Sequence, residues 1–325
     1  MPPKYSVILP VCHAGKFLYA ALESLAQTSS PQAGFEILVV GDSPDMDIAR
    51  SKIMPANRSV FIRHGGSRAA ALNAACAVAQ GEIWVFADDD CVFPKDWLLR
   101  IERALKDHPE AAVVGGRDQL PKVAALFDTS LDHALNSFAG TGGIRNDFSI
   151  RAGNYYPKLW NMIIRAEAAI RVSPGHDIFN TNLCVHEDVE LVDRIIKNGG
   201  QVLYEPEIVV GHYRDTNFPS FFCRNLHMAQ VCRAKGIHRR AHLAAVCFFV
   251  AIFLTAAAAP VLSASAWTFG VLSGSYATLL GLTGLTAAWR SHRPVLALTV
   301  PALIISLHVA RAIGFSTITP SRNAT

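Results

Sequence analysis

Short apolar runs alternate with amphipathic segments over the first 215 residues. Runs rich in β-branched and aromatic residues predict buried strands at 5–9, 35–40, 60–63, 82–87 and 111–114. Apolar residues at helical spacing predict helices over 16–27, 68–80, 96–107 and 187–198, and two short strands follow at 202–204 and 207–210. This alternation predicts an α/β fold, a three-layer sandwich around a mostly parallel sheet.

Polar residues follow three of these strands directly. Pro10 ends the first apolar run, Asp42 begins a turn after the second, and three aspartates at 88–90 follow the fourth. Since ligands of parallel sheets bind beyond the carboxyl ends of the strands, we expect these residues to meet at one crevice. The segment 119–151 has weak periodicity and many Gly and polar residues. It is predicted to be irregular and mobile around that crevice.

The three adjacent carboxylates of Asp88, Asp89 and Asp90 are the most distinctive chemical feature of the chain. They repel one another, so a folded protein holds them together where positive charge compensates. Mg²⁺ and Mn²⁺ prefer carboxylate oxygens and commonly bridge a protein to a diphosphate. The triplet therefore indicates a divalent cation, although a solvated acidic turn is the alternative when the triplet is taken alone.

The pattern changes after residue 215. Aromatic residues interleaved with arginines over 216–241 are typical of a basic amphipathic segment on an anionic membrane surface. Uncharged runs at 242–262 and 267–288 are long enough to span a bilayer, and 294–315 is a third candidate that contains Pro301, His308 and Arg311. A buried helical core is the alternative. We expect a catalytic domain at 1–215, a juxtamembrane segment at 216–241, two to three transmembrane helices within 242–315 and a tail at 316–325.

Charge divides the chain in the same place. All 26 acidic residues lie in the first 215 positions together with 21 Lys and Arg, whereas the remaining positions carry 9 basic residues and no acidic one. The net charge of +4 is the sum of these unlike parts and does not indicate nucleic-acid binding. Arg290 and Arg293 follow the second span, so the positive-inside rule predicts a multi-pass protein of the cytoplasmic (inner) membrane with its catalytic domain in the cytoplasm.

Two further observations agree with a cytoplasmic catalytic domain. The seven cysteines are scattered without a C-x-x-C pair, which is typical of reduced thiols and not of a disulfide framework or a zinc site. The first ten residues lack the charged-then-apolar pattern of a signal peptide.

An ordered set of motifs carries a family resemblance that covers residues 4–215. Its elements are Ser6–Val11, Glu36–Asp45, Arg68–Ala75, Asp88–Asp90, Gly115–Arg117, Asn161–Arg165 and Glu187–Asp188. Together they resemble a family 2 glycosyltransferase with the nucleotide-diphospho-sugar transferase (GT-A) fold. The resemblance implies transfer of a sugar from a nucleotide-diphospho-sugar donor, such as a UDP-sugar, in a membrane-anchored bacterial enzyme of cell-envelope polysaccharide synthesis.

The resemblance also implies a metal site of Mg²⁺ or Mn²⁺. Asp88 and Asp90 correspond to the outer members of the family's DxD motif. Asp90 would bind the metal, and Asp88 would reach the metal's water shell or the donor ribose. His212 lies where family members often have a His after the last strand, which implies a further metal or phosphate contact, with a structural role as the alternative.

Four other positions are implied to bind the donor: Pro10, Asp42, Arg68 and Asp89. Asp42 would contact the nucleoside, but this chain has Gly41 where the family usually has a second acidic or amide residue. Arg68 would touch a phosphate or the base, with an ordinary surface arginine as the alternative. Asp89 is the middle member of the triplet and would shape its turn.

Glu187 and Asp188 are the candidate catalytic residues. Asp188 would accept the proton of the attacking hydroxyl, while Glu187 orients the site or raises the pKa of Asp188 by repulsion; helix capping is the alternative for both. A single base implies direct displacement with inversion. Because the Gln-x-x-Arg-Trp sequence of processive synthases is absent around Arg224 and His227, we expect one sugar to be transferred per encounter.

The acceptor is expected to be a hydroxyl of a lipid-linked or surface-glycan precursor. Two other functions remain open from the sequence. A polyprenyl-phosphate sugar synthase would use a phosphate acceptor, and a catalytically inactive domain would serve as a membrane scaffold.

Overall fold

The computed structural model describes residues 4–11, 16–29, 31, 34–47, 59–121, 124–142, 155–175, 177–183, 185–213, 216–235 and 239–317. The chain divides into two compact units. Unit 1 comprises Met1–Ala124 and Asn154–Asp215, and unit 2 comprises Ala125–Gly153 and Thr216–Thr325.

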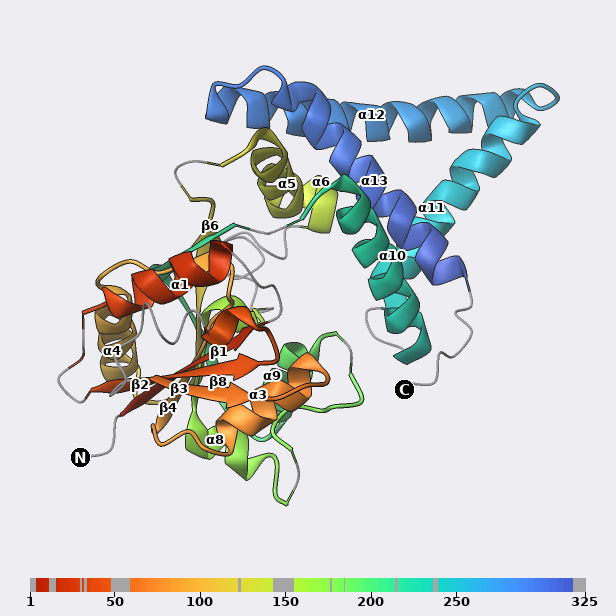
Figure 1. Cartoon of the computed structure of the whole chain (residues 1–325). Helices are drawn as coiled ribbons and strands as arrows, with labels where there is room; N and C mark the ends of the chain where they lie inside the picture. Colours follow the sequence, from red (N-terminus) through yellow and green to blue (C-terminus); the bar gives the residue numbers. More distant parts are fainter. Residues whose placement is uncertain are drawn as a thin grey trace. The chain divides into compact units, whose positions relative to one another are not determined.

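Unit 1 is built on an eight-stranded sheet with the order β3-β2-β1-β4-β7-β6-β8-β5 (Figure 1). Its strands are β1 (Tyr5–Val11), β2 (Phe35–Gly41), β3 (Ser59–Arg63), β4 (Ile83–Phe86), β5 (Cys91–Val92), β6 (Ala111–Gln119), β7 (Met162–Arg165) and β8 (Gln201–His212). β5 and β7 are antiparallel to their neighbours, and the other pairings are parallel. The predicted α/β fold with a mostly parallel sheet is confirmed.

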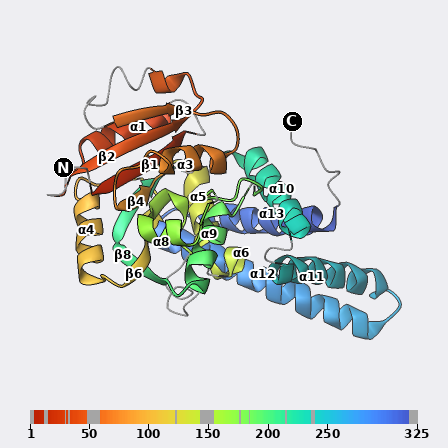
Figure 2. The ribbon, with the colours of Figure 1, turned by 90° about the horizontal axis from the view of Figure 1, so that it is seen from below.

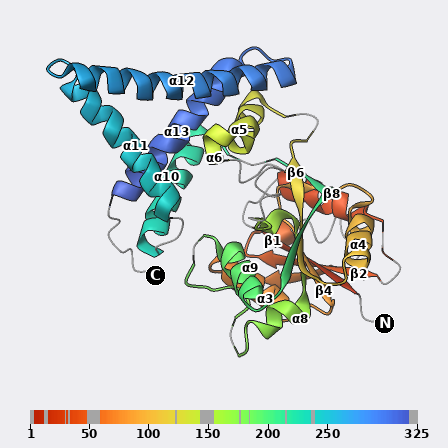
Figure 3. The ribbon, with the colours of Figure 1, turned by 180° about the vertical axis from the view of Figure 1, so that it is seen from behind.

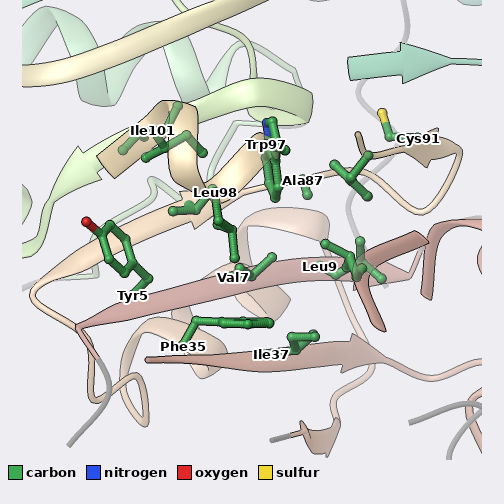
Figure 4. Close-up of a cluster of buried hydrophobic side chains, with 14 of the residues drawn as sticks. Tyr5, Val7, Leu9, Phe35, Ile37, Ala87, Cys91, Trp97, Leu98 and Ile101 are labelled. Carbon is green, nitrogen blue, oxygen red and sulfur yellow. The ribbon is translucent and has the colours of Figure 1, made fainter. Parts of the chain in front are cut away.

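Two helices cover one face of this sheet, α1 (Lys16–Ala26) and α4 (Trp97–Asp107). The alternate residues Tyr5, Val7 and Leu9 of β1 point to this face and are fully buried against both helices (Figure 4). Trp97 and Leu98 supply the largest side chains from α4 (Figure 4). Burying such apolar area is the main stabilising contribution to the sheet and holds its edge in place for the site.

The other face is covered by α3 (Arg68–Cys76), α8 (Ala166–Arg171) and α9 (Glu187–Lys197), as Figure 2 shows from below. Leu72 of α3 and Leu191 of α9 are fully buried there. Asn73 of α3 adds two hydrogen bonds, because its side chain donates to the carbonyl of Phe179 and accepts from the Phe179 amide, both at 2.8 Å. This pair fixes the loop that leads into α9.

Two strand predictions are corrected by the structure. β1 continues through Pro10 to Val11, because its β4 ladder ends at Ile8 and proline is tolerated where a strand edge has no partner. The two short strands predicted at 202–204 and 207–210 form one strand, β8, which pairs with β6 through a register shift.

The prediction that 119–151 is irregular is wrong for most of its described part. β6 extends to Gln119, and α5 (Leu126–Asn136) and α6 (Phe138–Thr141) follow. These helices belong to unit 2, where Leu131 and Ala134 are buried with residues from near the C-terminus. Residues 143–154 lie outside the described part of the chain.

Unit 2 otherwise consists of α10 (Phe218–Lys235), α11 (Arg239–Ala258), α12 (Ser263–Ser291) and α13 (Leu296–Ser316). These helices coincide with the predicted juxtamembrane segment and the three apolar runs. Within the described residues, α12 and α13 are long and apolar enough to cross a membrane. The predicted tail from residue 318 onward lies outside the described residues.

Candidate functional site

The acidic triplet lies at the carboxyl edge of the sheet. β4 ends at Phe86, opposite Ile8 of β1 on one side and Met162 of β7 on the other. The chain then turns through Asp88, Asp89 and Asp90 before entering β5. Both Asp89 and Asp90 are buried, with 3% and 8% of their surface exposed. A solvated acidic turn is therefore excluded.

β5 brings Asp90 to His212. Its residue Cys91 pairs with His212 of β8, and the amide of Tyr213 donates to the Asp90 carbonyl at 3.0 Å. As a result, Nε2 of His212 lies 3.2 Å from Oδ1 of Asp90. The other ring nitrogen, Nδ1, lies 3.5 Å from Oδ2 of Asp118 on β6. His212 is thus held between two carboxylates from neighbouring strands.

This arrangement determines the charge of the His212 ring. Burial lowers the pKa of His212, but hydrogen bonds to Asp118 and Asp90 and their negative charges outweigh burial and raise the pKa to about 9. Near neutral pH the ring is therefore a cation that compensates part of the acidic cluster.

The same residues fit a divalent cation. Ligand atoms of Asp90, Cys91 and His212 lie within 4.8 Å of one another, and all three residues are buried. An Asp oxygen and a His nitrogen are suitable ligands for Mn²⁺ or Mg²⁺. Cys91 is the exception, because burial and the nearby carboxylates raise the pKa of its thiol well above the usual value and keep it protonated. Asp90 and His212 are the two groups of this cluster that suit a hard cation.

Arg68 links the triplet to the other acidic pair. Ser67 caps α3 by accepting a hydrogen bond from the Ala70 amide, which sets Arg68 at the first helical position. The Arg68 guanidinium forms an ion pair with Asp88, and its Nε lies 3.9 Å from Oε1 of Glu187. Burial raises the pKa of both Asp88 and Glu187, while Arg68 lowers it. Arg68 therefore links the two acidic groups, and its predicted contact with a donor phosphate or base stays a prediction.

Glu187 and Asp188 begin α9 immediately after His186, which adopts a left-handed conformation with φ 64°. Both carboxylates are buried, at 6% and 8% exposure. Oδ1 of Asp188 accepts a hydrogen bond from the Val189 amide at 2.8 Å, so one oxygen is occupied by the backbone. The other, Oδ2, lies 3.6 Å from Nζ of Lys158.

Lys158 reaches Asp188 from the turn before β7. This turn, η1 (Leu159–Asn161), is anchored by Asn161, whose amide donates to the carbonyls of Ile208 at 2.8 Å and Arg117 at 3.2 Å. Trp97 donates to the Asn161 side chain at 3.2 Å. Because Asn161 is fixed from three sides, the neighbouring Lys158 is held at the base of α9.

The remaining predicted donor residues lie at the same sheet edge. Pro10 is buried within β1, next to Val40 of β2. Asp42 follows β2 with 75% of its side chain exposed, 3.9 Å from the Arg63 guanidinium. The contact that the structure describes for Asp42 is thus with β3, and its predicted role toward the nucleoside stays a prediction.

Two charged residues of the site were not predicted from the sequence. Asp118 directly follows the motif Gly115–Arg117, so its position next to a marked element was a usable signal. Lys158 gave no such signal, because an isolated lysine in a segment of weak periodicity is indistinguishable from a surface residue.

Comparison with known families decides the class of this site. The model of the glycosyl transferase family 2 matches residues 6–169, half of the chain. The protein belongs to glycosyl transferase family 2. It is a glycosyltransferase, and the matched region contains Arg68, the acidic triplet, Asp118 and Lys158.

A solved structure agrees with this fold. The glycosyltransferase superposes on the mannosyltransferase PcManGT of Pyrobaculum calidifontis, determined with GDP-Man and Mn²⁺, with a TM-score of 0.56 and 18% sequence identity over 96% of this chain and 87% of that chain. The 1–349 fragment of S. aureus TarS matches with a TM-score of 0.45 and 18% identity over 95% of this chain and 90% of that one. The superposition on the mannosyltransferase confirms the GT-A fold implied by the motifs.

Proposed function

We propose that this glycosyltransferase moves a single sugar from a nucleotide-diphospho-sugar to a hydroxyl group of a lipid-linked or surface-glycan acceptor. The reaction proceeds with inversion, depends on Mg²⁺ or Mn²⁺, and takes place at the cytoplasmic face of the membrane. One observation carries the proposal. Two buried acidic groups, Asp88–Asp90 and Glu187–Asp188, stand at one edge of the sheet and are joined through Arg68.

Asp188 is suited to act as the general base. One of its oxygens is held by the Val189 amide, which leaves Oδ2 as the atom that accepts a proton from the acceptor hydroxyl. Nζ of Lys158 lies 3.6 Å from this oxygen and helps to hold it in position. Loss of that proton makes the hydroxyl oxygen the nucleophile that attacks the anomeric carbon.

Asp90 and His212 are the residues that would hold the cation, with Asp88 close by. When bound, the cation supplies positive charge to the diphosphate leaving group. Asp118 orients the His212 ring from behind, as carboxylates commonly do for metal-binding histidines. The Mn²⁺ in the similarly folded mannosyltransferase supports this use of the site.

The apolar helices support a membrane location. Trp267 and Trp289 of α12 are 78% and 77% exposed, and the helix rise places them about 33 Å apart. This separation is close to the thickness of a bilayer's hydrocarbon core of about 30 Å, and tryptophans favour its two boundaries. α12 is thus suited to cross the membrane between them.

The first expected result concerns donor binding. In a thermal-shift panel of nucleotide-sugars with the purified full chain, one donor should raise the Tm by several degrees with Mn²⁺ present and by clearly less with EDTA, because a ligand stabilises the state that binds it. Free sugars are the control and should give no shift. If no nucleotide-sugar stabilises the protein at any Mn²⁺ concentration, the inactive scaffold is favoured and the proposal fails.

The second expected result concerns the proton released when Mn²⁺ binds. The pKa of His212 is raised to about 9, so the free protein carries a proton on the ring at pH 7.5, whereas a metal ligand must be neutral. Mn²⁺ binding should therefore release about one proton, and the apparent affinity should rise about tenfold per pH unit and level off above pH 9.

Calorimetry in two buffers of different ionisation enthalpy measures this release. The His212→Ala variant should lose the release along with part of the affinity. A wild-type titration without proton release would show that His212 is not a ligand.

The phosphate-acceptor alternative is distinguished by charge. Such a site needs uncompensated basic groups, but Arg68 pairs with Asp88 and Lys158 with Asp188 in the described site. The observed pairs therefore favour a hydroxyl acceptor that requires a base.

A further inference from the structure

We propose that Trp160 is a positioning residue for the cation site, because its side chain holds the His212 ring in the orientation that binds the metal. The inference rests on the proposed function, which assigns His212 to the cation and Asp188 to the acceptor hydroxyl. On this view the turn η1 sets both halves of the site, since Lys158, two residues before Trp160, contacts Asp188.

The Trp160 side chain packs directly on the His212 imidazole. The centroids of the two rings lie 5.0 Å apart, and their planes are inclined by 42°. His212 is buried, and its nitrogens already face carboxylates, Nε2 toward Asp90 and Nδ1 toward Asp118. β6, which carries Asp118, runs beside β8, which ends at His212 (Figure 3). Trp160 therefore adds an apolar contact to a ring that the carboxylates hold by its nitrogens.

This apolar contact restricts a movement that the carboxylates allow. A hydrogen bond to a carboxylate oxygen forms over a broad range of directions, so Asp90 and Asp118 leave the tilt of the ring open. Two packed rings leave little room for tilt, because moving either one opens a void or creates a clash. A histidine binds a cation through the lone pair of one nitrogen, which must point at the ion. Fixing the tilt of His212 therefore prepares that lone pair for the cation.

The turn that carries Trp160 is held too firmly to follow a movement of His212. Leu159 is buried in the core on the α3 and α9 side of the sheet, whereas Trp160 packs on the core on the α1 and α4 side. Asn161 makes the three hydrogen bonds described above. β7, which begins at Met162, lies between β4 and β6 within the sheet. η1 is thus fixed from both layers, and Trp160 gives His212 a rigid surface to pack on.

Lys158 places the same turn against the other half of the site. Its Nζ lies 3.6 Å from Oδ2 of Asp188, and 29% of its side chain is exposed. Oδ1 of Asp188 is the oxygen that accepts from the Val189 amide, so Lys158 contacts the one that remains. Lys158 therefore aligns Asp188 from the same turn on which Trp160 aligns His212. Because different side chains make the two contacts, each contact can be removed separately.

Mn²⁺ binding to the purified full chain, measured by calorimetry without substrate, tests the role of Trp160. Trp160→Ala should weaken Mn²⁺ binding about 10–100-fold, the usual effect of removing a neighbour that orients a metal ligand. Trp160→Phe keeps a ring on His212 and should bind Mn²⁺ within about threefold of wild type. Since Trp160→Ala also removes packing volume, Trp160→Leu is the second variant: it retains apolar volume without a ring and should lose affinity too.

Pulsed EPR of the bound Mn²⁺ reports the histidine directly, because the nitrogen of a coordinated imidazole modulates the signal. Wild type and Trp160→Phe should show this nitrogen coupling, and His212→Ala should lack it. Trp160→Leu at saturating Mn²⁺ should show a weakened coupling. A general loss of stability would lower the Tm and leave the coupling of the folded protein unchanged.

Lys158→Met tests the other half of the site. It keeps an unbranched side chain but removes the ammonium group, so kcat should fall about tenfold or more while Mn²⁺ affinity stays within about twofold of wild type. Trp160→Leu should show the reverse, with most of its rate restored at high Mn²⁺. Initial rates with the donor that stabilises the chain, over a range of Mn²⁺ concentrations, measure both effects. Lys106→Met, at an exposed position of α4, is the control and should match wild type.

Two results would overturn the inference. In the first, Trp160→Leu binds Mn²⁺ like wild type with unchanged nitrogen coupling. In the second, Trp160→Leu and Lys158→Met each lose rate and Mn²⁺ affinity together with a lowered Tm, which would make η1 a purely structural turn. Failure of the proposed function looks different, because wild type itself would then bind no Mn²⁺ or transfer no sugar, and the inference would fall with it before any variant is compared.

Discussion

The Asp188→Asn variant is expected to lose about 10²–10⁴-fold in kcat, the contribution of a general base. The donor Kd should change by no more than about twofold, since the described contacts of Asp188 are with Lys158 and the Val189 amide. The substitution keeps the size of the side chain but removes its ability to accept a proton. Initial rates at saturating donor and donor titrations measure the two quantities.

The matched control lies on the same helix. Asp193 pairs with Lys197 on the surface of α9, so Asp193→Asn should keep the wild-type rate and Tm. If Asp188→Asn retains most of its turnover, the assignment of Asp188 as the general base is wrong. An acceptor that needs no base, such as a phosphate, is then favoured.

The Asp90→Asn variant is the second of the two largest effects. It removes a charged ligand atom next to His212 from a buried site, and the cation's stabilisation of the leaving group is worth several kcal/mol. We therefore expect a loss of about 10³-fold in kcat/KM and a large fall in Mn²⁺ affinity. Activity as a function of Mn²⁺ concentration separates weakened metal binding from a loss that metal does not restore.

Two further variants show whether the effect is specific. Asp107→Asn, at the exposed end of α4, should behave as wild type. Cys91→Ala should keep its Mn²⁺ affinity, because the protonated thiol is not expected to bind the cation. A Cys91→Ala variant that loses metal while Asp90→Asn keeps it would reverse the assignment of the ligands.

The sheet and its site edge were predictable from the sequence because both follow from local patterns. β4 is a continuous apolar run that ends at the triplet, and the helical spacing of Val189, Val192 and Ile196 identifies α9. Pro10 misled the prediction of β1, since its effect on a strand depends on whether a neighbouring strand is present at that position.

Features that depend on distant partners were not predictable. α5 buries Leu131 and Ala134 against helices more than 140 residues later in the chain. Its own sequence therefore does not show a clear helical pattern. Asp118 acquires its role only because β6 pairs with β8 and so faces His212. Lys158 acquires its role through the anchoring of Asn161. Such contacts are set by topology, and a single sequence without its fold does not contain them.

The central claim is that this site transfers a sugar with inversion, using a divalent cation and Asp188. The most direct measurement follows the anomeric configuration of the product by NMR, after the full chain is incubated with the stabilising nucleotide-sugar, Mn²⁺ and membrane lipids. We predict a product of inverted configuration that forms with wild type, does not form in EDTA, and forms about 10²–10⁴-fold more slowly with Asp188→Asn. A product of retained configuration, or equal transfer without a cation, would contradict the account.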